Sequence, residues 1–286
     1  MFGKIIFNAM VNAQSAIPVN ENDYEKDGIL YCGNCHTPKQ AQIVFNGIEL
    51  KPMCLCKCLK EKYEEKERKE RKEQRKIRVE RNRIDSLHER KFCEYTFQND
   101  SGNNKKIIET CHKYVMKWSE VFKDNIGLLF WGDTGNGKTF AAACIANYLI
   151  DNEISVCMTS FPAILNDLSG FTVRDKNEYI DELCDVDLLI IDDLGCERQS
   201  DFAMEIVYSV IDARYCKKKP MIITTNVMLD EMKQTRDLRL KRIYSRILEM
   251  CVPVLFSSED ERLKIAKEKR NALADYLTKG IEDDKL

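Results

Sequence analysis

Gly132-Asp133-Thr134-Gly135-Asn136-Gly137-Lys138-Thr139 is the stretch that decides the fold of this 286-residue chain. It matches the pattern G-x-x-x-x-G-K-[ST] and follows an apolar run, residues 126–131, that is typical of a buried strand. Its glycines allow the backbone to wrap around a phosphate chain, so that successive N–H groups point at the anion. Lys138 adds a positive charge for the β- and γ-phosphates, and Thr139 adds a hydroxyl ligand for Mg²⁺. The eight residues therefore predict a site for a nucleoside triphosphate, with ATP and Mg²⁺ as cofactors.

The composition is ordinary for a soluble protein, with 44% hydrophobic residues, 32% charged residues and a net charge of -2. This small net charge gives no indication of nucleic acid binding, so any basic surface must be local. No apolar run is long enough to span a membrane, and residues 1–7 are too short for a signal peptide. We therefore expect a cytoplasmic protein that keeps most of its 13 cysteines reduced, as small buried hydrophobes.

From about residue 92 onward, short apolar runs alternate with helical stretches. Short bounded strands are typical of a parallel sheet that is covered on both faces. The predicted strands are 126–131, 154–159, 187–192, 221–225 and 252–256. The predicted helices lie near 139–150, 161–168, 177–184, 201–216 and 239–249. This repeating order predicts an α/β domain over residues 92–286, with a parallel five-stranded sheet flanked by helices.

Two acidic residues end the apolar run at 187–192, where ATP chemistry needs a carboxylate near Mg²⁺. We expect Asp192 to hold the metal through water, and Asp193 to orient or deprotonate the attacking water. Asn226 follows the next strand along the chain, and we expect it beside Asp193, where it places the water or senses the γ-phosphate. One further strand lies between the first strand and the acidic strand. This layout is typical of ATPases with a separate catalytic acid and a polar sensor.

Arg242 and Arg246 are four residues apart, so they lie on one face of a predicted helix and can reach a common target. The transition state of phosphoryl transfer spreads negative charge that a guanidinium from a neighbouring subunit can stabilise. An ordinary surface helix is the alternative. The functional interpretation predicts an active site that is incomplete in a monomer.

Five cysteines cluster before residue 60 and predict a metal site. Cys-x₂-Cys followed by Cys-x-Cys about 20 residues later can furnish four thiolates for tetrahedral Zn²⁺. The candidate ligands are Cys32, Cys35, Cys56 and Cys58, with Cys54 as an alternative in the second pair and His36 as a weaker substitute. Redox-active or free thiols and an iron–sulfur cluster are the other interpretations.

Asn46-Gly47 predicts a hairpin between the two cysteine pairs, as in a zinc ribbon. Residues 1–59 have few large apolar groups, so a metal would supply the stability of this module, on the order of 10–16 kcal/mol in zinc-finger peptides.

Residues 60–91 are almost entirely charged and have no apolar stripe to bury. Favourable pairs with Glu four residues before a cation occur at 64–68, 65–69 and 67–71. They predict a solvated helical linker. The second half is locally basic, so a contact with nucleic acid or an acidic partner is the alternative, and charge alone does not choose between them.

Together these motifs resemble a known family. The nucleotide-binding stretch, residues 189–195, residues 224–226 and residues 242–246 look like those of the DnaC/DnaI-type replicative helicase loaders. These loaders are AAA+ ATPases, closely similar to the IstB transposition helpers. Residues 205–215, which lead to Lys219-Pro220 and the sensor strand, also fit. The resemblance covers roughly residues 95 to 275.

The resemblance implies further roles. Arg246 would be an arginine finger with Arg242 as its helper, and Arg262 would be the second sensor arginine. Ser258 stands where the family usually has Gly, and Asp193 stands where the broader AAA+ pattern has Glu. Because the side chain of Asp193 is one methylene shorter than that of Glu, it should hold the attacking water less well, and we predict slow ATP hydrolysis. We also expect a minimal C-terminal lid, since about 30 residues follow the last predicted strand.

The function implied by the resemblance is an ATP-dependent replication protein that loads a hexameric replicative helicase onto single-stranded DNA. ATP binding and hydrolysis to ADP and phosphate would act as the switch for self-association. Similar zinc modules dock on the helicase in DnaI-type loaders, which favours this function. An IstB-like transposition helper, which binds duplex DNA and recruits a transposase, is the alternative. A non-enzymatic adaptor is a third possibility, which the intact set of Lys138, Asp192, Asp193, Asn226 and Arg246 argues against.

Overall fold

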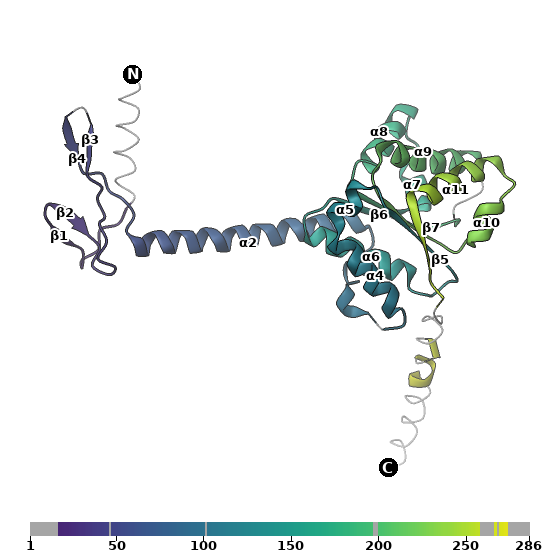
Figure 1. The fold of residues 1–286 in the computed structure, drawn as a ribbon, viewed down its shortest axis with the longest axis horizontal. Helices are drawn as coiled ribbons and strands as arrows, with labels where there is room; N and C mark the ends of the chain where they lie inside the picture. The colour runs from purple at the N-terminus through teal and green to yellow at the C-terminus, as the bar shows by residue number, and fades with distance from the viewer. Residues whose placement is uncertain are drawn as a thin grey trace, which may run out of the picture. The chain divides into compact units, whose positions relative to one another are not determined.

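The computed structural model describes residues 17–45, 47–100, 102–196, 200–257, 266–267 and 269–273. The chain forms two compact units, Met1–Arg78 and Val79–Leu286 (Figure 1). The long helix α2 (Lys57–Leu87) contains the boundary between them. Within the described residues, no helix combines the length and the apolarity needed to cross a membrane.

The first unit contains two small antiparallel hairpins. β1 (Tyr24–Lys26) pairs with β2 (Ile29–Tyr31), and β3 (Ile43–Phe45) pairs with β4 (Ile48–Leu50). The second hairpin turns where the sequence predicts it: Gly47 has φ +78°, while Asn46 lies outside the described residues.

A buried ion pair stabilises this unit where apolar side chains are few. Lys39 Nζ lies 2.5 Å from Asp23 Oδ2, and both side chains are 1% exposed. Lys39 also donates to the carbonyl of Pro18, and Asp23 accepts the backbone N–H of Gly33. The hydrogen bond from Lys39 lowers the pKa of Asp23 to about 2. The pair therefore ties the chain next to Gly33 to the rest of the unit.

α2 is a 31-residue helix in which only Leu87 is buried. Its surface carries Glu65–Lys69 at 3.5 Å and Glu67–Arg71 at 3.6 Å, two of the three predicted ion pairs. Glu64 instead pairs with Lys60, at 3.9 Å. Exposed pairs of this kind each contribute only about 0.3–0.5 kcal/mol. The helix is therefore maintained by its good helix-forming residues together with the summed contribution of several such pairs.

The second unit is built on the predicted five-stranded parallel sheet. Its strand order is β6-β7-β8-β5-β9. The strands are β5 (Gly127–Trp131), β6 (Val156–Ser160), β7 (Leu188–Leu194), β8 (Met221–Thr225) and β9 (Cys251–Leu255). Each begins and ends within two residues of its predicted range, because short apolar runs bounded by polar residues mark buried strands clearly. The α/β expectation is confirmed.

Helices cover both faces of this sheet (Figure 1). Leu128 and Phe130 of β5 pack into one core, and Leu129 between them packs into the other, as the two-residue period of a strand requires. The first core is closed mainly by α4 (Lys105–Met116) and α6 (Lys138–Asp151), with α3 (Arg90–Cys93), the 3₁₀ turn at Phe97–Asn99 and α5 (Trp118–Lys123) nearby. The second is closed by α7 (Phe161–Asp167), α8 (Val173–Leu183), α9 (Asp201–Lys217), α10 (Leu229–Gln234) and α11 (Leu238–Met250).

Arg214 of α9 is fully buried and fastens the loop before β7. Its Nη1 donates to the carbonyls of Cys184 and Val186, at 3.1 and 2.7 Å. Its Nη2 donates to the carbonyls of Asp187, at 3.1 Å, and Pro220. Burial lowers the pKa of this guanidinium to about 10. One side chain thereby aligns the starts of β7 and β8, the two strands that end at the candidate site.

Replacing Arg214 tests this anchor. Arg214→Met should lower the free energy of unfolding by roughly 3 kcal/mol or more, because the carbonyl oxygens would lose their donor at about 1–3 kcal/mol for each one left buried. The measurement is urea unfolding followed by circular dichroism. Arg239→Met is the matched control: Arg239 pairs with Asp201 at 2.6 Å and its side chain is 60% exposed, so its loss should cost less than about 1 kcal/mol. Equal losses would contradict the anchoring role.

Candidate functional site

The loop between β5 and α6 needs glycine where its backbone approaches the end of β9. Gly132 has φ +131°, and a Cβ on it would lie 2.3 Å from the carbonyl oxygen of Phe256. Gly135 and Gly137 also have positive φ, at +79° and +86°, and Gly137 is the N-cap residue of α6. The loop therefore ends at the N-terminus of a 14-residue helix, where unbonded N–H groups and the helix dipole favour an anion.

Side chains hold the loop on the adjacent strand. Asn136 is 3% exposed and donates from Nδ2 to the carbonyl of Phe256, at 3.0 Å. Asn104, from the start of α4, donates to the carbonyl of Asn136 at 2.7 Å. Asp133 and Thr134 of the same loop are exposed. The loop is thus fixed by hydrogen bonds at Asn136 and exposed at Asp133 and Thr134, as a phosphate-binding loop requires.

Lys138 joins the loop to the end of β8. Its Nζ, 6% exposed as a residue, donates to the carbonyls of Gly132 and Asp133, at 2.9 and 2.6 Å, and to Asn226 Oδ1, at 2.8 Å. All three of these acceptors are oxygen atoms. Phosphate oxygens of a bound triphosphate offer the same kind of acceptor with a full negative charge.

Asp192 is a half-buried carboxylate near the end of β7. Thr139 donates its hydroxyl to Asp192 Oδ1 at 2.8 Å, and Thr224 donates to the same atom at 2.6 Å. Burial raises the pKa of Asp192, and the charge of Asp193 adds to this, while the two hydroxyls oppose it. A cation would relieve the cost of this partly desolvated charge. Carboxylate and hydroxyl oxygens suit Mg²⁺, so Asp192 and Thr139 fit that ion.

Asp193 is turned out of the sheet by a β-bulge. The pairing of β7 with β8 shifts between Ile191 and Leu194, and Asp193 has φ +59°, a costly conformation for a residue with a side chain. Thr224 stabilises it by accepting the Asp193 N–H at 2.9 Å. The exposed carboxylate lies 3.4 Å from Asn226 Nδ2. The bulge thereby gives two adjacent acids different environments, one half-buried and one exposed to water.

Thr224 is the site residue that sequence reasoning missed. Its hydroxyl binds both Asp192 and the backbone of Asp193, so it orients the two acids together. The available signal was a pair of threonines, Thr224 and Thr225, at the end of an otherwise apolar strand just before Asn226.

Arg246 does not contact the nucleotide-binding loop of its own chain within the described residues; its contacts are with α9. Its Nη2 lies 2.7 Å from Asp212 Oδ1, and its guanidinium lies over the rings of Tyr208 and Tyr215, at 4.8 and 5.5 Å. Asp212, Tyr208 and Tyr215 recur every three to four residues, so they form one face of α9. These motif residues had no role assigned from the sequence; in the structure they hold Arg246.

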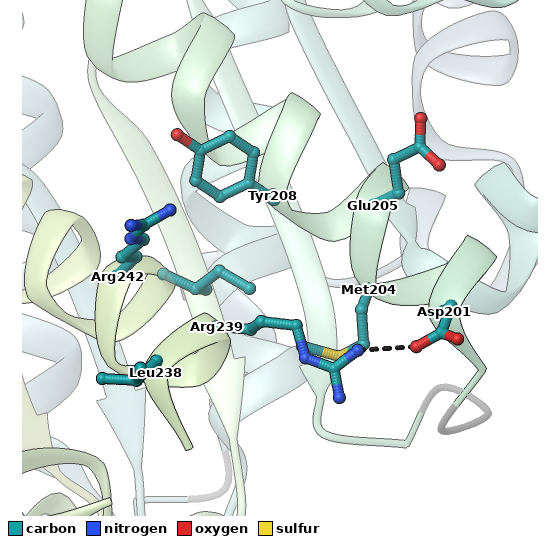
Figure 2. Close-up of a pocket in the computed structure, with 8 residues that line it drawn as sticks. Asp201, Met204, Glu205, Tyr208, Leu238, Arg239 and Arg242 are labelled. Carbon is teal, nitrogen blue, oxygen red and sulfur yellow. Dashed lines mark hydrogen bonds and ion pairs between the residues drawn. The ribbon is translucent and has the colours of Figure 1, made fainter. Parts of the chain in front are cut away.

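Arg242 is exposed and borders a hollow of about 340 Å³ between α9 and α11 (Figure 2). Glu205 and Tyr208 line the α9 side, and the Arg239–Asp201 ion pair closes one end. Arg242 and Arg246 thus lie on one helix, as predicted. Arg262 and Ser258 lie outside the described residues, as does most of the expected C-terminal lid.

In the first unit, the structure brings together Cys32, Cys35, Cys56 and Cys58, whose sulfur atoms all lie within 4.8 Å of one another. Cys58 Sγ is 3.6 Å from Cys32 Sγ and 3.5 Å from Cys56 Sγ. Zn–S bonds of about 2.3 Å in a tetrahedron place sulfurs about 3.8 Å apart, so the spacing fits Zn²⁺. The other two candidates lie apart: Cys54 Sγ contacts the Pro38 carbonyl, and the His36 ring contacts Tyr24.

The protonation of the cluster also favours a cation. The Thr37 hydroxyl, followed by the backbone of Cys58, lowers the pKa of Cys35 to about 5. The neighbouring thiols, Cys56 first, raise the pKa of Cys58 to about 12. Four thiols this close cannot all ionise by themselves, whereas a bound metal deprotonates its thiol ligands.

Comparison with known proteins identifies the family. The model of the IstB-like ATP binding proteins matches residues 54–270. This chain belongs to the IstB-like ATP binding protein family. The match includes all of the ATP-site residues described above and begins at Cys54.

Named relatives of this IstB-like protein are replicative helicase loaders. DnaC of Escherichia coli is 29% identical over 158 residues, 53% of this chain and 62% of DnaC. DnaI of Bacillus subtilis is 26% identical over 161 residues, 52% of this chain and 51% of DnaI. The alignments thus span about half to three fifths of these relatives. A crystal structure of DnaI superposes with a TM-score of 0.50 at 22% identity, covering 60% of this chain and 93% of that structure, which supports the fold. The resemblance to the DnaC/DnaI group is confirmed.

The cysteine cluster makes a testable prediction. We expect the purified chain to hold about one Zn²⁺, and Cys56→Ser to lose it, because three thiolates bind the ion far more weakly than four. Metal content by mass spectrometry is the measurement. Cys54→Ser is the matched control and should keep the metal. Loss of zinc in Cys54→Ser with retention in Cys56→Ser would reverse the assignment of the second pair.

Proposed function

We propose that this IstB-like protein is an ATP-switched loader that places a hexameric replicative helicase on single-stranded DNA. The observation that carries the proposal is the hydrogen-bonded group at the strand ends: Lys138 bonds Asn226, Thr139 bonds Asp192, and Asn226 lies beside Asp193. A protein that used ATP only to order its fold would not need an exposed acid and a sensor amide at this position. The named relatives, which are replicative helicase loaders, support the choice of process.

The ATPase roles follow from this group. The N–H groups of residues 132–139 and the ammonium of Lys138 bind the phosphate chain of ATP. Thr139 and Asp192 hold Mg²⁺, which neutralises charge on the β- and γ-phosphates. Asn226 orients the attacking water, and Asp193 accepts its proton. Hydrolysis is slow, because the short side chain of Asp193 holds this water loosely, and a helicase or DNA partner accelerates it.

A second copy of the chain completes the site. Arg246 stabilises the transition state in the neighbouring subunit, with Arg242 as its helper and Arg262 as the second sensor. Two features support this proposal. Arg242 and Arg246 lie on one helix, α11, and the Arg246–Asp212 pair is partly exposed, with 26% and 35% of the side chains accessible. Such a pair is exchanged for a triphosphate at low cost.

Residues 1–59 form the helicase-docking module in this proposal, with Zn²⁺ held by Cys32, Cys35, Cys56 and Cys58. Residues 60–91 form the linker to the ATPase domain, residues 92–286. The competence of the cysteine cluster for zinc supports the module, and the charged, fully helical α2 supports the linker.

The loading function is tested by mixing the protein with a hexameric replicative helicase from the same host, ATP and a single-stranded oligonucleotide. We expect a stable complex by size exclusion with light scattering, and its loss in Lys138→Ala, which removes the charge that binds the β- and γ-phosphates. The family offers a second candidate, a transposition helper. Absence of a helicase complex, with ATP-dependent binding of duplex DNA and a transposase instead, would select that function.

Completion of the site by a neighbour is tested by mixing variants. Arg246→Ala should bind ATP with wild-type affinity but lose hydrolysis on the order of a thousandfold, the effect of an arginine finger. Adding Lys138→Ala, which binds no ATP but retains Arg246, should restore turnover at the Arg246→Ala sites. Arg239→Ala, on the same helix, is the matched control and should keep wild-type turnover. Unchanged hydrolysis in Arg246→Ala, or no rescue in the mixture, would place the finger elsewhere.

A further inference from the structure

Helix α2 changes its charge chemistry at Arg68. Residues 57–67 contain four lysines, no arginine and four glutamates, so their charges cancel. Residues 68–78, all within the first unit, contain four arginines, three lysines and two glutamates, a net charge of +5. The whole chain has a net charge of -2, so this positive charge is concentrated rather than general.

Part of this charge lies on one face of the helix. Arg68, Arg71, Lys72 and Arg75 have the spacing i, i+3, i+4 and i+7, which places them on one side of an α-helix. All four are exposed, and they border a hollow of about 400 Å³ together with Glu64 and Glu67. We call these four residues the α2 basic face.

The ion pairs that Arg68 and Arg71 form within α2 compete only weakly with an anionic ligand for these arginines. Arg68 pairs with Glu65 at 2.5 Å and Arg71 with Glu67 at 3.6 Å, in both cases within α2. The side chains of Arg68 and Arg71 are 65% and 81% exposed, so water and salt screen both pairs. A multivalent anion can replace these glutamates without unfolding any part of the unit.

The α2 basic face lacks what a protein or a membrane would need. A protein interface has an apolar core, and a membrane-bound helix has an apolar face. Ile77 is the one large apolar residue between 68 and 78, and at nine positions after Arg68 it lies on the opposite side of the helix. The fitting ligand is therefore a chain of regularly spaced anions that needs no apolar contact.

We infer that the α2 basic face binds the phosphate backbone of a nucleic acid, independently of base sequence. Arginine suits this ligand, since its planar fork binds two phosphate oxygens at once, and three of the four residues are arginines. From Arg68 to Arg75 the helix rises about 10 Å, which equals the axial rise of about three phosphates along one strand of B-form DNA, at about 3.4 Å each. The face lies outside the ATP site and needs no ATP, so this inference goes beyond the proposed loading function.

The test compares two triple variants of the full zinc-bound chain. One is Arg71→Gln/Lys72→Gln/Arg75→Gln, and the control is Lys60→Gln/Lys62→Gln/Lys66→Gln on the same helix. Both lose three positive charges, and glutamine preserves the helix, which circular dichroism checks. Binding to a fluorescent single-stranded oligonucleotide is measured by anisotropy without nucleotide, at several salt concentrations.

In the basic-face variant we expect the slope of log K against log salt to become less negative by about two. This corresponds to a loss of about a hundredfold in affinity at 0.1 M salt. The lysine control should keep the wild-type slope, and Arg71→Lys/Lys72→Arg/Arg75→Lys should keep most of the affinity. A polyglutamate peptide should not compete.

Equal losses in both triple variants, no loss in the basic-face variant, or competition by polyglutamate as strong as by DNA would each overturn the inference. The last result would assign the face to an acidic protein. Because ATP and helicase are absent from this assay, failure of the loading function leaves its outcome unchanged. The two proposals are therefore rejected separately.

Discussion

The half-buried carboxylate of Asp192 is the constraint on which the ATPase unit depends. A partly desolvated charge near the end of a strand needs compensation, and in the described part of the chain the hydroxyls of Thr139 and Thr224 donate to it. Those hydroxyls belong to the helix after the phosphate loop and to the next strand of the sheet. The hydrogen bonds to this one carboxylate therefore align β7, β8 and α6. They do not neutralise its negative charge, which suits a cation such as Mg²⁺.

The cysteine cluster applies the same principle in a different way. Four thiols within 4.8 Å make a site that is poorly stabilised without a cation, in a unit whose apolar content is too small to fold around it alone. The second unit differs, because two large apolar cores pack on the faces of its sheet. We therefore expect ligand binding to be coupled to folding more tightly in the first unit than in the second.

Much of this arrangement is predictable from sequence, because its signals are local. The phosphate loop, Asp192 at the end of an apolar run, and Cys32 and Cys35 in one turn are each set by neighbours in the chain. The strands and main helices follow from the same short-range patterns of burial. The long helix α2 follows from helix-forming residues and glutamates placed four before a cation. Hairpin β3–β4 follows from Asn46-Gly47.

Other features depend on contacts between distant parts of the chain, which no local pattern encodes. The sequence motif requires a glycine at position 132, but only the structure shows why: a side chain there would clash with the carbonyl of Phe256, the residue after β9. The sequence predicted different roles for Asp192 and Asp193 but not their environments, whereas the bulge against β8 leaves Asp192 half-buried and Asp193 exposed. It left Cys54 and Cys56 as alternatives, which the packing around Pro38 separated. The tertiary structure decided these points because burial and register arise only when strands far apart in sequence pair.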